Sequence, residues 1–199
     1  MNTKMFFQHG KKAGTTEKVV HFYASKGYAV TSNQYAIYLE KIDIDLGNED
    51  FQIETAVLKK AKGQWQDLGR HAANVPYPSI ISVIDPPLYG GFTFKVSKAE
   101  FVRLMRQADQ VSCENAYWVK LTWAKGKLTA KVATPMGEYE GTTDIEGYWE
   151  DSFNGKVEWL EMVKGFRSDE LEITKLGKAL MIRGVSHDEI FCVSPVKVD

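Results

Sequence analysis

Residues 92–111 read FTFKVSKAEFVRLMRQADQV and decide the fold class. The first five residues alternate apolar and polar side chains, which is typical of a half-buried strand. From Ser97 onward the apolar residues recur at three- and four-residue spacing, and Glu100 follows Ser97 by three positions, as in a capping box. The stretch therefore predicts a strand that leads directly into an amphipathic helix over about 98–111.

The sequence after this helix is mostly strand. Apolar and polar residues alternate on both sides of a turn at Lys125-Gly126, which predicts a hairpin with one lysine-rich face. A second helix is expected from Gly155 to about Phe166, with Asn154 as its cap. Residues 138–151 are acidic and are expected to form a solvated strand and loop. Three further strands are predicted near the end of the chain: 171–176, 179–183 and 189–193.

The first part of the chain predicts strands and one short helix. A hairpin is expected on either side of residues 25–27, a further strand in 36–44, and a helix in 55–62. Residues 1–16 show no periodic pattern. Clusters of proline and glycine in 75–91 predict a boundary near Gly91, between a domain of residues 1–91 and a domain of residues 92–199. Few helices among many consecutive strands indicate an α+β fold with antiparallel sheets.

Composition excludes several classes of protein. The 199 residues carry a formal net charge of -1, which argues against a protein that coats nucleic acid by overall charge. No apolar run is long enough to span a membrane and no secretory signal is evident, so the protein is expected to be cytoplasmic. The two cysteines and four histidines have no metal-ligand spacing, and no cofactor is expected. The motifs of phosphate-binding loops and serine hydrolases are missing.

Two kinds of chemistry stay open from the residues alone. A hydrolase could use Cys113 with His187, because such a pair meets in space rather than in sequence. Arg103 and Arg106 stand three apart on the first helix, and Lys164 and Arg167 lie at the end of the second. These cations suit phosphate contact, and the alternative is an ordinary solvated helix face.

The order of elements and several local strings resemble the DNA sliding clamp family, in particular the last domain of the bacterial polymerase clamp. Residues 92–110 resemble the opening strand and first helix of that domain, and 157–183 resemble its second helix and closing strands. The tail FCVSPVKV, residues 191–198, resembles the family's C-terminal strand with its apolar-x-Pro-apolar-basic-apolar ending. This resemblance covers residues 92–199.

The first part resembles a piece of the preceding clamp domain. Residues 28–36, YAVTSNQYA, are similar to a strand–turn–strand that in clamps carries the pattern Thr-Asp-Gly-His-Arg-Leu, of which this chain retains only Thr31. Residues 75–86 are similar to the Phe-Pro-x-Tyr-x-x-Val-(Ile/Leu)-Pro segment at the end of that domain. No opening strand–helix unit precedes them, so residues 1–91 are expected to form a truncated clamp-like domain.

The resemblance implies a sliding-clamp-like architecture with two packed helices per domain and a non-enzymatic function in DNA replication or repair. Clamp domains close into a ring of six, which would need three copies of this chain, and partner proteins bind a peptide pocket between domains. The alternative is an adaptor or inhibitor that keeps the fold without forming a ring. The residues implied for contact with duplex DNA are Lys98, Arg103, Arg106, Lys164 and Arg167. Those implied for the peptide pocket are Thr31, Asn33, Gln34, Tyr35, Pro195, Val196 and Lys197.

Overall fold

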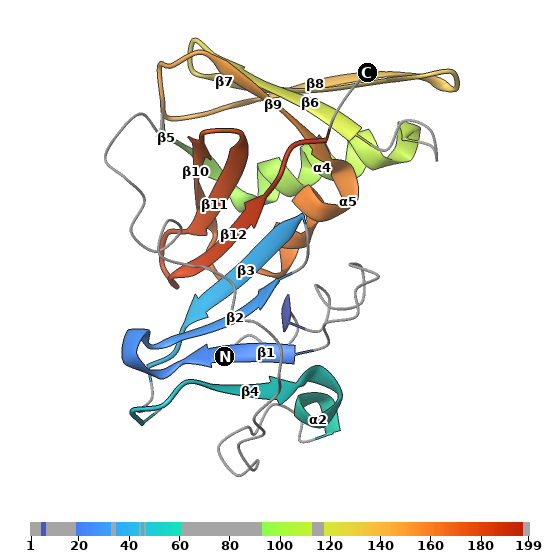
Figure 1. Cartoon of the computed structure of the whole chain (residues 1–199). Coiled ribbons are helices and arrows are strands. Elements are labelled where there is room, and N and C mark those ends of the chain that lie inside the picture. Colours follow the sequence, from blue (N-terminus) through green and yellow to red (C-terminus); the bar gives the residue numbers. More distant parts are fainter. Residues whose placement is uncertain are drawn as a thin grey trace.

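The computed structural model describes residues 5–6, 19–32, 35–43, 45, 47–60, 93–112 and 118–196. Its strands form two antiparallel sheets, one of eight strands and one of four (Figure 1). The first part of the chain contributes β1 (Val19–Tyr23), a 3-10 turn η1 (Ala24–Lys26), β2 (Tyr28–Ser32), β3 (Ala36–Lys41), β4 (Phe51–Glu54) and helix α2 (Thr55–Lys60).

The later part contributes eight strands, two helices and one 3-10 turn. They are β5 (Thr93–Ser97), α4 (Lys98–Val111), β6 (Trp118–Ala124), β7 (Lys127–Thr134), β8 (Gly137–Asp144), β9 (Asp151–Lys156), α5 (Val157–Leu160), the 3-10 turn η2 (Glu161–Gly165), β10 (Glu170–Leu176), β11 (Ala179–Gly184) and β12 (Glu189–Val193). The fold is therefore α+β with antiparallel sheets, as the sequence predicts.

One sheet crosses from the first part of the chain to the later part. Its strand order is β4-β1-β2-β3-β12-β11-β10-β5, so β3 and β12 pair at its centre. The register places Glu40 opposite Glu189 and Tyr38 opposite Phe191. The smaller sheet, in the order β8-β7-β6-β9, belongs entirely to the later part. The two parts are thus joined by backbone hydrogen bonds as well as by side chains.

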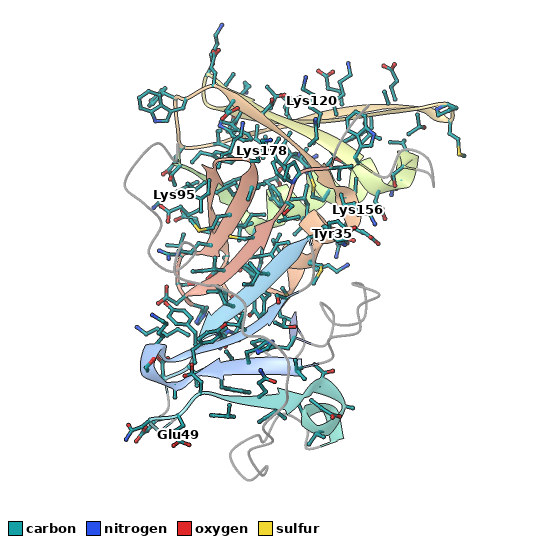
Figure 2. The ribbon with its side chains drawn as sticks, in the orientation of Figure 1. Tyr35, Glu49, Lys95, Lys120, Lys156 and Lys178 are labelled. Carbon is teal, nitrogen blue, oxygen red and sulfur yellow. The ribbon has the colours of Figure 1, made fainter. Side chains whose placement is uncertain are left out.

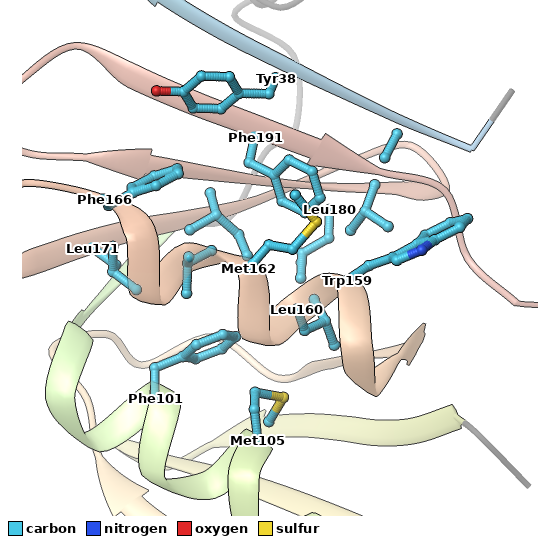
Figure 3. Packing of buried hydrophobic residues seen from close by; sticks show 14 of the residues in the cluster. Tyr38, Phe101, Met105, Trp159, Leu160, Met162, Phe166, Leu171, Leu180 and Phe191 are labelled. Carbon is cyan, nitrogen blue, oxygen red and sulfur yellow. The ribbon is translucent and has the colours of Figure 1, made fainter. Parts of the chain in front are cut away.

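Packing holds α4 in place. Phe101, Leu104 and Met105 are fully buried, and α4 contacts β7, β8, α5 and η2 (Figure 3). Burying three such side chains stabilises the folded chain by roughly 5–9 kcal/mol, whereas an exposed ion pair contributes less than about 1 kcal/mol. The polar side chains on the outer face of α4 are therefore not needed to hold the helix.

Most predicted elements are confirmed, including the helix over 98–111 and the three closing strands. The predicted hairpin is β6–β7, whose two-residue turn has Lys125 and Gly126 at φ 52° and 74°. Both angles lie in the left-handed region, which glycine adopts at little cost. The acidic stretch forms the solvated edge strand β8, where Glu140 and Asp144 pair with Lys131 and Lys127.

Two sequence expectations are corrected, the start of the second helix and the capping box, and two further features have no signal in the sequence. The second helix does not begin at Gly155, because Asn154 and Gly155 belong to β9 and pair with β6. Its residues divide into the short helix α5 and the turn η2. Ser97 makes no capping hydrogen bond through its side chain, and Glu100 pairs with Arg103 instead. Strand β4 was not predicted. Residues 1–16 showed no pattern, yet Met5 and Phe6 are fully buried.

Candidate nucleic-acid interface and peptide pocket

Two helical segments bring four of the predicted DNA-contacting residues to one surface. Phe101 and Met105 of α4 face Leu160 of α5, and α4 contacts both α5 and η2, so the two segments lie side by side (Figure 3). A surface hollow of about 390 Å³ lies between them, and we call it the basic hollow. Its lining includes Lys98, Arg103, Arg106 and Lys164, together with Ala99, Val102 and Gln107.

Every cation of the basic hollow has a carboxylate nearby. Arg103 pairs with Glu100 at 2.8 Å and Lys98 with Asp169 at 3.4 Å. Glu161 serves two cations, Arg106 at 3.3 Å and Lys164 at 2.8 Å. Four positive charges thus face three negative ones, which leaves a local net charge of +1. Because exposed pairs are worth less than about 1 kcal/mol each, a phosphate group can replace a carboxylate as the partner.

The four cations of the basic hollow differ in solvent exposure and in how many groups their side chains bind. The Lys98 side chain is only 19% exposed, and its ammonium group also donates a hydrogen bond to the backbone carbonyl of Phe166 at 3.0 Å. The Arg106 side chain is 63% exposed. Arg103 is 43% exposed and also donates to Gln107 and to the Thr142 carbonyl, so Arg106 is the group best able to reach a ligand outside the hollow.

Arg167 lies apart from the basic hollow, at the joint between β3 and β12. Its guanidinium donates to Glu40 at 2.8 Å and to Glu189 at 3.1 Å, and both carboxylates are almost completely buried. Its backbone N–H also donates to Glu189 at 2.7 Å. Burial opposes the charge of Arg167, but the two carboxylates outweigh it and raise the pKa of the guanidinium. We call Arg167, Glu40 and Glu189 the joint triad.

The predicted peptide-pocket residues are only partly brought together. The backbone N–H of Ser194 donates to the carbonyl of Tyr35 at 2.8 Å, and that of Val196 donates to the carbonyl of Asn154 at 2.9 Å. The end of the described chain therefore runs between the start of β3 and the edge of β9. Tyr35 is 54% exposed, and Pro195 is exposed. Thr31 is buried in β2, and Asn33, Gln34 and Lys197 lie outside the described residues.

Sequence reasoning missed two residues of this surface. The Trp159 ring lies 5.3 Å from the Tyr35 ring, and the Lys156 ammonium lies 5.2 Å from the centre of the Trp159 ring. Figure 2 shows Tyr35 and Lys156 close to each other near the middle of the molecule. We call Tyr35, Trp159, Lys156, Pro195 and Val196 the aromatic surface. Trp159 is only 7% exposed, and no motif in the sequence separates it from the core.

The described residues contain neither a metal-binding cluster nor a reactive thiol. They contain no group of three or more histidines, cysteines and acidic residues able to hold a metal ion. Burial raises the pKa of the Cys192 thiol to about 12, so this cysteine stays protonated near neutrality. Cys113 lies outside the described residues.

Within the described part of the chain, no helix has both the length and the hydropathy needed to cross a membrane.

Comparison with known proteins identifies the fold. No family model and no curated protein matches the sequence. Among solved structures, the chain is similar to the DNA polymerase III subunit beta of Pseudomonas aeruginosa, with a TM-score of 0.77 and 12% identity over 98% of this chain and 65% of that one.

Two other sliding clamps give the same result. The DNA polymerase sliding clamp of Caulobacter crescentus has a TM-score of 0.77 and 12% identity, with 99% of this chain and 64% of that one covered. The clamp of Bartonella birtlesii bound to griselimycin has a TM-score of 0.78 and 16% identity, with coverages of 98% and 64%. The chain thus spans a little under two thirds of the length of these clamps. On this evidence, the chain has the fold of the bacterial DNA polymerase III beta sliding clamps.

Proposed function

We propose that this chain is a non-enzymatic, cytoplasmic, sliding-clamp-like protein that contacts duplex DNA and binds replication or repair proteins. In this proposal residues 92–199 form one clamp-like domain and residues 1–91 a truncated one. The main support for DNA contact is the basic hollow. Two packed helical segments place four cations along it: Lys98, Arg103, Arg106 and Lys164. Such a surface suits phosphate contact, which carries no sequence information and lets DNA slide.

The local charge limits the strength of this contact. With four cations, at most four phosphates are neutralised, and the logarithm of the binding constant should fall with the logarithm of salt concentration with a slope of about -2 to -4. The three neighbouring carboxylates favour the lower end of this range. DNA contact by one copy should therefore be weak, and retention on DNA would depend on ring closure.

Ring closure is proposed to use three copies of the chain. Within the described residues, β8 pairs only with β7, so the outer edge of its eight residues is open to a strand of another copy. The second candidate function is a clamp-derived adaptor or inhibitor that binds proteins without forming a ring. The basic hollow has four cations but also three carboxylates, so its net positive charge is small. This favours the adaptor, because an adaptor does not need a positively charged surface that attracts DNA.

The aromatic surface is the proposed site for clamp-binding peptide motifs. The exposed Tyr35 ring offers apolar area and rests against the buried Trp159 ring, and the strand edge near Val196 offers backbone hydrogen bonds. Tyr35→Ala should weaken capture of a clamp-binding peptide by about tenfold or more. Met136→Ala, at another exposed apolar side chain, is the matched control. Equal binding by both variants, or undiminished capture after removal of residues 195–199, would place the peptide site elsewhere.

DNA contact is tested by reversing charge. Arg103→Glu with Arg106→Glu should abolish measurable binding of a labelled duplex and flatten its salt dependence. The control is Lys120→Glu with Lys131→Glu, which changes the net charge equally at exposed sites on the opposite face of the four-stranded sheet. If both double variants bind duplex DNA like the original chain, the basic hollow is not the DNA site.

Mass in solution separates the two candidate functions. A ring predicts a trimer that stays on circular DNA and slides off linear DNA with open ends. An adaptor predicts a monomer or dimer with equal retention on both. A monomer that still captures the peptide would support the adaptor and reject the ring.

A further inference from the structure

The loop of residues 145–150, between β8 and β9, carries two adjacent exposed aromatic side chains. Tyr148 is 89% exposed and Trp149 is 57% exposed. The other large exposed hydrophobic residues of the described chain, Tyr35, Met136 and Val185, are separate in sequence. Single exposed apolar residues are common, but an adjacent tyrosine and tryptophan at a loop tip need a reason.

The base of this loop is held firmly. Lys95 and Glu146 exchange two backbone hydrogen bonds of 3.1 and 3.0 Å, and the N–H of Ile145 donates to the carbonyl of Gly126 at 2.9 Å. Gly147 packs so closely on β5 that an added Cβ would lie 2.9 Å from the Cβ of Phe94. The base of the loop is therefore fixed before any ligand arrives, which lowers the entropic cost of binding at its tip.

The charge around the two rings is negative. Residues 144–151 include four acidic residues and no lysine or arginine. Asp144 pairs with Lys127, and Asp151 pairs with Lys175. Glu146 and Glu150 are exposed, and their carboxylates form no ion pair with any described residue. Within the described residues, the rings thus lie in sequence between two exposed carboxylates that form no ion pair, because Lys95, opposite Glu146, pairs with Glu170 instead.

We propose that this loop is a docking site for a short lysine- or arginine-rich segment of a partner protein. Cationic side chains of that segment lie over the rings of Tyr148 and Trp149 and form ion pairs with Glu146 and Glu150. Charge complementarity selects this occupant, because a nucleic acid or an anionic membrane would be repelled by the same carboxylates.

The available area sets the size of the partner segment. Because Tyr148 is 89% and Trp149 57% exposed, the two side chains can bury roughly 220–370 Å² together, which is less than the roughly 800 Å² per partner of a standard protein interface. The site therefore fits a few residues of an extended segment and should bind it weakly, with a dissociation constant on the order of 0.1 mM.

The test uses the whole chain and a labelled (Arg-Gly)4 peptide, with fluorescence anisotropy measured at low and high salt. Tyr148→Ala with Trp149→Ala should weaken binding about tenfold, and Glu146→Gln with Glu150→Gln should weaken it similarly while reducing the salt dependence. The change to glutamine removes the charge of residue 146 but keeps its two backbone hydrogen bonds with Lys95. The matched controls are Met136→Ala and Glu138→Gln with Glu140→Gln, all exposed and outside the loop, and each should change binding less than twofold.

Several results would overturn the proposal. One is failure of the original chain to bind the peptide at millimolar concentration. Another is equal weakening by the loop variants and the controls. Binding of (Glu-Gly)4, of single-stranded oligo(dT) or of zwitterionic lipid vesicles that is lost in the Tyr148→Ala/Trp149→Ala variant would assign the loop to a different class of ligand.

Discussion

Removing the cation of the joint triad should weaken the contact between the two parts of the chain. Arg167→Met keeps much of the side-chain volume but leaves Glu40 and Glu189 facing each other across the β3–β12 pair, 1% and 0% exposed. Breaking a buried ion pair costs about 3–5 kcal/mol. The Arg167 side chain is 43% exposed, so solvent reduces this figure, and we expect a loss of about 2–4 kcal/mol in the free energy of unfolding.

Urea unfolding followed by circular dichroism measures this loss. Arg103→Met is the matched control, because the Arg103 side chain is also 43% exposed but its partner Glu100 is 45% exposed, and this change should cost less than about 1 kcal/mol. In a chain that already carries Glu40→Gln and Glu189→Gln, Arg167→Met should cost less than about 1 kcal/mol. An equal loss in both backgrounds, or a loss no larger than that of Arg103→Met, would refute the role of the triad.

Two further predictions concern local sites. Burial lowers the pKa of His21 from 6.5 to about 4, so the unfolded chain binds the proton more readily than the folded chain. The stabilisation is complete above pH 6.5 and is lost as the pH falls toward 4, by up to about 3 kcal/mol. In urea titrations His21→Leu should lose stability less steeply over this interval, and a parallel profile would contradict the assignment. Gly147→Ala should lower the free energy of unfolding by about 1–3 kcal/mol, because its new methyl group would lie too close to Phe94. An unchanged free energy of unfolding in the same urea titration would show that β5 shifts to make room.

Local pattern predicted the elements whose periodicity is strong. The helix over 98–111 follows from its apolar stripe, and the closing strands follow from alternation between glycine-containing turns. The second helix was predicted to begin too early because Asn154 is a favourable cap and Gly155 follows it. Pairing with β6 holds both residues in β9 instead, and such tertiary pairing is not visible in a short window of sequence.

The candidate sites were predictable to different degrees. Arg103 and Arg106 share a helix face by spacing alone, and Lys164 joins them because the two helical segments pack together. The role of Arg167 could not be predicted from the sequence, because its partner Glu40 lies 127 positions away and becomes a neighbour only when β3 pairs with β12. Trp159 contacts Tyr35 for a similar reason, since the ends of distant elements meet at one place.

The pairing of β3 with β12 also bears on how the protein could be divided. Since the central hydrogen bonds of the large sheet join the two parts, their association does not depend on the covalent link alone. The two parts, made as separate polypeptides, would each display a bare strand edge complementary to that of the other. The two fragments should therefore associate when they are mixed, by pairing β3 with β12. Either fragment made without the other would be prone to aggregate through its uncovered strand edge.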